Sequence, residues 1–320
     1  MDIFSKSLPL YTAPISVLAN FLLINLIIFK SPAQMGNYKY LLIGVSLFEI
    51  FYGILDFLAE TRVLSVGPSF VVVIPYKDRF FDKKWAEFLN CLYCGFFGFS
   101  MGMFVIIFAY RLFVATENQI LQKFKGPKII FWFLYPFLHL ALFYIDAWLP
   151  YSPFPEMDEF VGPDILKSLN LSLDDVAYTG PLFYSKITNS VRIPTMVVSM
   201  LQYLFTASSL CLVIYFGFRC YFEIMKLVQI PNTVSLKIKN LQKQLFFALV
   251  FQAMVPIILM HIPVTILYTC SLLDIIFRLP VESTIALFPA LDPFPTIFIV
   301  KSYRNTILGT VTCKKIEKKT

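Results

Sequence analysis

Residues 245–273 read LFFALVFQAMVPIILMHIPVTILYTCSLL, a stretch of 29 residues without Asp, Glu, Lys or Arg. A helix needs about 20 consecutive apolar residues to cross the hydrocarbon core of a bilayer, where the backbone must pair its own polar groups. The composition agrees with this environment, because 58% of the chain is apolar and only 15% is charged, against about 25% in soluble domains. The stretch therefore predicts a transmembrane helix.

Six more stretches of this kind predict an all-α membrane protein, built as a bundle of seven transmembrane helices. The predicted helices cover residues 9–29, 40–59, 86–116, 129–150, 193–218, 245–273 and 283–300. We expect residues 1–304 to form one membrane domain and residues 305–320 to form a basic cytoplasmic tail.

Lys and Arg divide unevenly between the two sides of this bundle. Of the 27 Lys and Arg residues, 26 lie outside the apolar stretches, and the exception is Arg111 near the end of the third stretch. The segments that follow the first, third, fifth and seventh stretches hold 17 when Arg111 is counted with them, and the other side holds 10. Because positive loops stay in the cytoplasm, we expect the N-terminus outside and the tail inside. The net charge of +7 then faces anionic lipid and acidic proteins, and we expect no nucleic acid partner.

The predicted outer segments carry two further features. Residues 151–192 contain six carboxylates and four prolines, so we expect an extended lid with little regular structure. Asn170 begins the triplet Asn-Leu-Ser in this lid, an N-glycosylation acceptor that is either occupied or unused. Residues 63–76 are apolar but short and interrupted by a Gly-Pro pair, so we expect them to fold over the outer mouth without spanning.

Polar residues inside the apolar stretches are candidates for a conformational switch. A charged side chain at the bilayer centre costs about 2.5 to 3.5 kcal/mol on insertion scales, so such groups face the bundle interior or water. The rise of a helix places Asn20, Glu49 and Asp292 near the membrane midplane. We hypothesise that they form a buried cluster, with one carboxyl group protonated, that joins three helices and repacks during switching. Alternatively, the same contacts only hold the helices together. Pro256 and Pro293 are each either a hinge or a static kink.

Helical spacing groups side chains where small-molecule sites form, between the helices of a bundle. The candidates on the third, fifth and sixth helices are Cys94, Phe97, Met101, Met196, Met200, Tyr203, His261, Thr265 and Tyr268. Each group is either a ligand contact or ordinary packing. His261, in the outer third of its helix, is the polar side chain that we single out for testing.

The sequence predicts no enzyme, metal site or cofactor. The two histidines lie far apart, and no acidic residues cluster on one helix face, so no catalytic constellation is evident. Cys91 and Cys94 have the spacing of a metal-binding pair. Without further ligands at suitable spacing, we interpret them as packing residues.

Four groups of residues carry a family resemblance. They are Asn20, Leu22, Leu23, Ile24, Lys30, Ser31, Pro32, Gly36, Tyr38 and Lys39; Tyr110 and Arg111; Leu241, Gln242, Gln244, Leu245, Phe246, Ala248, Leu249, Gln252 and Pro256; and Phe288, Pro289, Leu291, Asp292, Pro293, Tyr303 and Arg304. Residues from about 9 to 304 thereby resemble nematode serpentine chemoreceptors of the Str class or a close relative. The resemblance implies a rhodopsin-like G-protein-coupled receptor in the plasma membrane of sensory cilia. Such a receptor binds a small odorant or other environmental chemical from the outer side and activates a heterotrimeric G protein.

For coupling to the G protein, we expect Arg111 at the inner end of the third helix, next to Tyr110, with Lys237 and Lys239 on the rim. The lysines alternatively serve as topology charges and lipid anchors. Tyr110 stands where rhodopsin-like receptors carry an acid, so the usual Arg–acid lock is in doubt.

Two other functions remain as alternatives, a seven-helix ligand-gated channel and a small-molecule transporter. A channel of the insect odorant type would place its N-terminus inside, opposite to the charge count. A transporter would show internal repeats with paired interrupted helices, and we see no repeat between the two halves.

Overall fold

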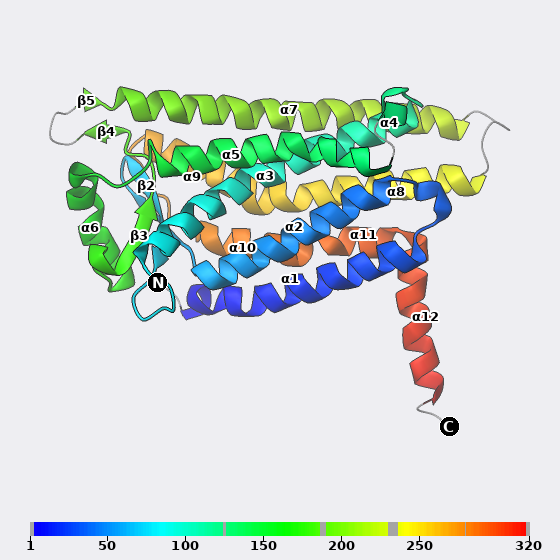
Figure 1. Ribbon diagram of the computed structural model, residues 1–320, viewed down its shortest axis with the longest axis horizontal. Helices are drawn as coiled ribbons and strands as arrows, with labels where there is room; N and C mark the ends of the chain where they lie inside the picture. Colours follow the sequence, from blue (N-terminus) through cyan, green and yellow to red (C-terminus); the bar gives the residue numbers. More distant parts are fainter. Residues whose placement is uncertain (1–2, 124–125, 186–189, 230–235, 279, 318–320) are drawn as a thin grey trace.

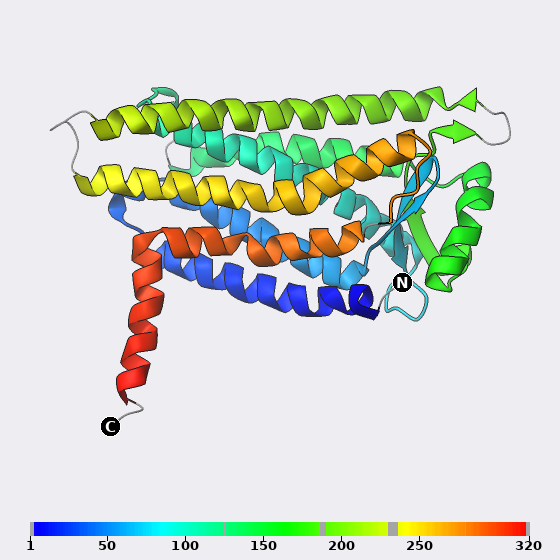
Figure 2. The same cartoon turned by 180° about the vertical axis from the view of Figure 1, so that it is seen from behind.

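The computed structural model describes residues 3–123, 126–185, 190–229, 236–278 and 280–317. Its long helices lie lengthwise as a bundle, with most of the strands and one short helix gathered at one end (Figure 1, Figure 2). The lengthwise helices are α1 (Ile3–Lys30), α2 (Tyr38–Ala59), α3 (Lys83–Ala115), α5 (Leu134–Trp148), α7 (Ile193–Gln229), α8 (Leu236–Pro256), α9 (Ile262–Leu272), α10 (Val281–Leu291) and α11 (Pro293–Ile299). Short connections are η1 (Ala33–Met35), α4 (Ile120–Lys123) and η2 (Gly126–Phe133).

Six helical spans in the described ranges are long and apolar enough to cross a membrane, and the bent pair Val281–Ile299 with Lys301–Gly309 makes a seventh if it counts as one. A π-helical turn, η4 (Ile257–His261), joins α8 to α9 within one of these spans. Two helices extend beyond their apolar stretches, because α7 continues to Gln229 and α8 begins at Leu236. Hydropathy marks where a helix leaves the hydrocarbon, whereas the helix itself ends where its backbone pairing ends.

α3 is the most buried of these spans, because 78% of its most apolar 18 residues are buried, against only 11% of the corresponding 18 residues of α7. α3 packs against both α5 and α7. At Gly102 of α3, an added Cβ atom would lie 2.6 Å from the Cα atom of Pro136 on α5. Such small residues let membrane helices approach backbone to backbone. α3 therefore provides the packing surface that positions its neighbours.

The fold is mostly helical, as predicted, but the expectation of an all-α protein is wrong at one end of the bundle. There β1 (Arg62–Val66), β2 (Ser69–Pro75) and β3 (Val176–Thr179) form an antiparallel sheet in that order. Val63 pairs with Val72 across the hairpin, and Val73 pairs with Tyr178. The β-branched residues of segment 63–76 favour this extended pairing.

The expectation of little regular structure in residues 151–192 is also wrong. The segment contains α6 (Pro155–Leu169), η3 (Leu173–Asp175), β3, β4 (Tyr184–Ser185) and β5 (Ser190–Val191). Pro155 occupies the first turn of α6, and Glu156 and Asp158 lie near the positive end of its dipole. Asn170 ends α6 in the left-handed conformation, a common helix stop. The prolines and carboxylates that suggested an irregular lid are therefore helix-forming signals here.

The two ends of the bundle differ. α1 begins at the end that carries the sheet and α6, whereas α12 (Lys301–Glu317) lies at the opposite end and projects away from the bundle (Figure 1). The chain bends by 93° where it enters α12. The expected tail at 305–320 is therefore helical as far as Glu317, and residues 318–320 lie outside the described ranges.

Candidate functional site

Two adjoining cavities lie in the half of the bundle next to the sheet. One of about 80 Å³ lies beneath β2, and one of about 180 Å³ extends between α3, α5, α7 and α9. Phe97, Phe143, Gln202, Val264 and Tyr268 line both of them. Because an apolar cavity of about 150 Å³ is enough to hold benzene, the larger cavity has room for a small organic molecule.

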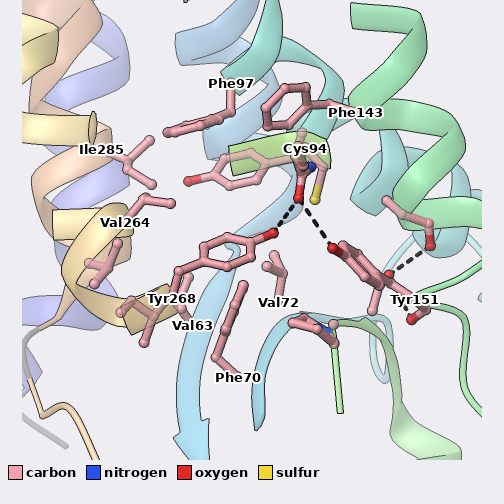
Figure 3. Close-up of a pocket in the computed structure, with 18 residues that line it drawn as sticks. Val63, Phe70, Val72, Cys94, Phe97, Phe143, Tyr151, Val264, Tyr268 and Ile285 are labelled. Atoms are coloured by element: carbon pink, nitrogen blue, oxygen red, sulfur yellow. Dashed lines mark hydrogen bonds between the residues drawn. The ribbon is translucent and has the colours of Figure 1, made fainter. Parts of the chain in front are cut away.

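Strand β2 forms the roof of the smaller cavity. Phe70 and Val72 line this cavity beneath the strand (Figure 3). Side chains alternate between the two faces of a strand, so Val71 and Val73 point the other way and pack against α6. Gly180 completes the roof so tightly that an added Cβ atom would lie 2.0 Å from the carbonyl oxygen of Phe70. The strands and α6 thus form two layers over the cavity.

Uncharged polar side chains meet across the cavities. Tyr268 Oη on α9 donates to Gln202 Oε1 on α7 at 2.6 Å, and Tyr151 Oη donates to the same oxygen at 3.3 Å (Figure 3). Tyr151 Oη also lies 2.7 Å from Ser199 Oγ. Burial raises the pKa of Tyr151 to about 12, so its hydroxyl keeps its proton near neutral pH. This group joins α7 and α9 at the level of the cavities.

His261 is a buried polar residue with neither ring nitrogen hydrogen-bonded among the described residues. It is only 6% exposed and lines the larger cavity. His261 ends the π-helical turn η4, two residues before Pro263. Pro263 has no N–H to offer the preceding turn, and π-helical adjustments are a known response to proline in membrane helices. Buried polar groups are normally paired, so His261 is an exception in the cavity wall, together with the hydroxyl of Tyr93 in the smaller cavity.

Seven of the nine predicted ligand residues line these cavities. They are Cys94, Phe97, Met101, Tyr203, His261, Thr265 and Tyr268. The choice of Met196 and Met200 is corrected, because neither lines either cavity and Met200 is 57% exposed. On a helix that faces lipid, large apolar side chains point outward and polar ones point toward the protein.

Sequence reasoning missed Gln202, Tyr151, Phe143 and the strand residues of the roof. One signal was present on α7, where Ser199, Gln202 and Thr206 recur at helical spacing and mark its inward face. Residues 63–76 were expected to fold over the mouth of the bundle, but which of their side chains line the cavity depends on how the hairpin pairs.

The predicted switch residues lie together deep in the bundle. Asn20 on α1, Glu49 on α2 and Asp292 between α10 and α11 each have 0% exposure. Asn20 Nδ2 donates to the carbonyl oxygen of Pro289 at 3.0 Å. That carbonyl lacks its usual helical donor, because the residue four positions later is Pro293, which carries no N–H. A contact between α1 and α10 thus replaces a backbone hydrogen bond.

Gln252 on α8 extends this cluster to a further helix. Its Nε2 donates to Asp292 Oδ2 at 2.5 Å, and its Oε1 accepts from Thr296 Oγ1 at 3.1 Å. The carboxyl group of Glu49 is close enough to Asp292 for an electrostatic interaction, and neither of its oxygens has a hydrogen-bond partner among the described residues. Pro256 lies one turn beyond Gln252, at the end of α8. We call Asn20, Glu49, Gln252 and Asp292 the polar core.

Arg111 is buried, with 2% exposure, near the C-terminal end of α3. One Nη donates to the carbonyl oxygen of Gln242 on α8 at 2.9 Å, and the guanidinium lies 4.9 Å from the ring centre of Tyr38. Within the part of the chain that the structure describes, no carboxylate forms an ion pair with Arg111. Tyr110 stacks on Tyr38 at 5.9 Å. The guanidinium of Arg111 therefore joins α3 to α8 through the carbonyl oxygen of Gln242. This contact takes the place of the Arg–acid pair of rhodopsin-like receptors, which the sequence had put in doubt.

The remaining predicted sites are dispersed. Lys239 is 6% exposed, so it does not lie on an open rim as expected, and the side chain of Lys237 lies outside the described part of the chain. Asn170 is exposed at the end of α6. In the described ranges, no group of three or more His, Cys, Asp or Glu residues is arranged to hold a metal ion.

Comparisons with known proteins agree on one family. The family model described as serpentine type 7TM GPCR chemoreceptor Str matches residues 6–308. G-protein coupled receptor str-217 of Caenorhabditis elegans is 60% identical over 312 residues, which cover 97% of this chain and 91% of that protein. Two other proteins of this nematode are each 25% identical: serpentine receptor class r-10, over 88% of this chain and 84% of that protein, and G-protein coupled receptor str-33, over 90% and 85%.

The chain belongs to the Str family of serpentine chemoreceptors, which are seven-transmembrane G-protein-coupled receptors. The resemblance drawn from the sequence motifs is confirmed. This family consists of chemosensory receptors and not of channels, transporters or enzymes, so the two alternative functions are set aside.

Proposed function

We propose that this receptor binds a small odorant-type molecule in its two cavities and responds by activating a heterotrimeric G protein at the opposite end of the bundle. The observation that carries the ligand site is His261. Its imidazole is buried and has no hydrogen-bond partner among the described residues, on the wall of a cavity of about 180 Å³. A ligand that hydrogen-bonds to His261 satisfies this side chain at the moment of binding.

The route from ligand to polar core runs along α9, η4 and α8. His261 lies at one end of η4, and Gln252 lies one turn before its other end. Pro256 and the π-helical turn between them interrupt the regular hydrogen-bond ladder, which gives this span a place to bend. Bending there alters the contact between Gln252 and Asp292, and the polar core repacks.

The G protein docks at the inner ends of the helices. The hydrogen bond from Arg111 to Gln242 holds α8 against α3 in the resting arrangement. Outward movement of α8 breaks this bond and exposes Arg111 to the G protein, with Tyr110 supporting its position. Lys237, in the first turn of α8, adds positive charge to this segment of the chain.

The sheet and α6 face outward in a rhodopsin-like arrangement, with the N-terminus outside and α12 in the cytoplasm. The excess of Lys and Arg in the segments of one side supports this orientation. Membership of a chemoreceptor family supports a place in the plasma membrane of a sensory neuron, at its cilium.

The experiment is a screen of small molecules in cells that report both G-protein activation and membrane current. We expect ligands that activate the G protein without a direct current. His261→Phe keeps an aromatic ring but removes both nitrogens, and it lowers the potency of such a ligand. Met200→Leu, on the exposed face of α7, is the matched control and leaves potency unchanged. Equal potency in both variants would contradict the proposed site.

A further inference from the structure

We propose that the ligand is uncharged and lipid-soluble, and that it reaches the cavities from the bilayer through an opening between α7 and α9. This inference rests on the proposed ligand site and names the chemistry and route that the site selects. Three features carry it: the lining of the cavities, their closed roof and their exposed side wall.

The lining favours an uncharged molecule. Of the described residues that line the two cavities, none is Asp, Glu, Lys or Arg. The polar groups are hydroxyls, the amide of Gln202 and the imidazole of His261. An ionised ligand would lose its hydration without gaining a charged partner, which is far more costly than burying a neutral polar group. The cavities therefore admit a mainly apolar molecule with one or two hydrogen-bonding groups.

The roof does not offer a passage from the outer solution. Thr179 Oγ1 donates to the carbonyl oxygen of Ala147 at 2.7 Å, which fixes the end of β3 to α5. Above this layer, Tyr178 Oη donates to Asp158 of α6 at 2.5 Å. Next to Thr179, Gly180 is packed against the backbone of β2 with no space for a methyl group. A ligand entering from this side has to separate the strands and α6 together.

The side wall between α7 and α9 is different. Tyr203 and Ala207 of α7 line the larger cavity, yet Tyr203 is 45% exposed and Ala207 is also exposed. Thr265 and Tyr268 of α9 line the same cavity from the other side. Because α7 is the least buried of the spans, its exposed surface at Tyr203 and Ala207 faces lipid. Thus the cavity reaches the hydrocarbon at this point.

Cys94 allows the route to be tested without knowing the ligand. It lines the smaller cavity but not the larger one, whereas Gln202 and Tyr268 line both. In a variant that keeps Cys94 as its single cysteine, two methanethiosulfonates are compared on intact cells: the uncharged methyl reagent and a membrane-impermeant quaternary ammonium reagent. In each case the thiolate attacks the reagent, forming a disulfide and releasing methanesulfinate. Reaction of unfolded protein with both reagents verifies that the thiol is intact.

We expect the uncharged reagent to modify Cys94 and the cationic reagent to leave it unmodified. Ala207→Trp narrows the opening and slows the uncharged reaction at least about tenfold, equivalent to a barrier increase of about 1.4 kcal/mol. Leu204→Trp, on the 65% exposed face of the same helix and away from the cavities, leaves the rate unchanged. Ala207→Phe repeats the test, and surface expression is measured for every variant.

Modification by the cationic reagent, an unchanged rate in both Ala207 variants, or no reaction with either reagent would each overturn the route. These outcomes do not depend on signalling, so they are distinct from failure of the proposed receptor function. In the ligand screen, activation by permanently charged compounds would overturn the ligand class while leaving the receptor assignment in place.

Discussion

In the orientation that we propose, the half of the bundle next to the sheet is the outer half and the opposite half is the inner half. The two halves differ in how their interiors are filled. The outer half contains the two cavities, lined by apolar and uncharged polar side chains. The deeper half contains the polar core and Arg111, where carboxyl groups and a guanidinium are buried and joined to neighbouring helices. The half with the cavities has space for a ligand, and the half with the polar core and Arg111 has contacts that hold the helices in one arrangement.

This difference separates two tasks within one bundle. A ligand gains binding energy where the interior is empty and where a polar group such as His261 lacks a partner. A switch needs discrete contacts that can be exchanged, and hydrogen bonds between helices provide them. Substitutions in the outer half are therefore expected to alter potency, whereas substitutions in the inner half alter basal or maximal signalling.

The largest expected effect is at Arg111. Arg111→Gln removes the guanidinium that we propose contacts the G protein once α8 has moved. A charge-assisted hydrogen bond contributes about 1.5 to 3 kcal/mol, so we expect ligand-stimulated G-protein activation to fall about 10- to 100-fold. Ligand affinity stays unchanged, because the cavities lie in the other half. The measurement is nucleotide exchange on the G protein in membranes, with Arg219→Gln on the exposed inner part of α7 as the control. Intact signalling in Arg111→Gln would remove the coupling role.

Gly102 tests whether α3 is the rigid packing surface of both halves. Gly102→Ala places a methyl group 2.6 Å from the Cα atom of Pro136, and overpacking of this kind costs about 1 to 3 kcal/mol. We expect a lower thermal unfolding midpoint in detergent. Gly309→Ala on α12 is the control, because its added Cβ atom meets nothing within 4 Å. Equal midpoints in the two variants would show that the contact between α3 and α5 is loose.

Two asparagines on α1 distinguish the polar core from ordinary helix surface. Asn20→Leu leaves the Pro289 carbonyl without its donor, whereas Asn25→Leu removes only a hydrogen bond to Phe21 within the same helix. Loss of the hydrogen bond from Asn20 to Pro289 destabilises the resting arrangement by about 1 kcal/mol or more, so we expect basal signalling to rise about fivefold. Asn25→Leu leaves it unchanged. The same basal activity in both variants would favour the simpler reading, in which Asn20 only holds helices together.

The smallest effect is expected at Asn170, on the surface of the outer end. If the acceptor at Asn170 is occupied, Asn170→Gln removes its glycan, so the protein runs faster on a gel and no longer responds to a glycosidase. Signalling is unchanged, because the side chain is exposed and distant from both regions. If the native protein carries no glycan, the side of the membrane on which α6 lies is tested instead by the binding of an antibody to this end on intact cells.

The sequence was informative where burial of charge limits the choices. Asn20, Glu49 and Asp292 were predicted to meet because few other places in a bilayer accept a carboxyl group. Gln252 belonged to a recognised motif, but the rotation of α8 that turns it toward Asp292 depends on packing. The apolar stretches predicted most of the helices, although not the extensions of α7 and α8.

The outer end was harder to predict, for a physical reason. The signals in residues 151–192 are shared by loops and helix ends, and only the buried stripe of α6 against β2 decides between them. Met196 and Met200 were chosen because apolar side chains usually point inward. Lipid reverses that rule on α7, where Gln202 faces the cavity and Met200 is exposed.

The central claim is that ligand binding in the outer cavities separates the inner ends of α3 and α8. Spin labels at Thr116 and Lys243, which are exposed next to Arg111 and Gln242, report this distance by double electron–electron resonance in a background without other cysteines. An activating ligand is predicted to lengthen the distance, and His261→Phe is predicted to abolish the change. An unchanged distance while the same ligand activates the G protein would contradict the account.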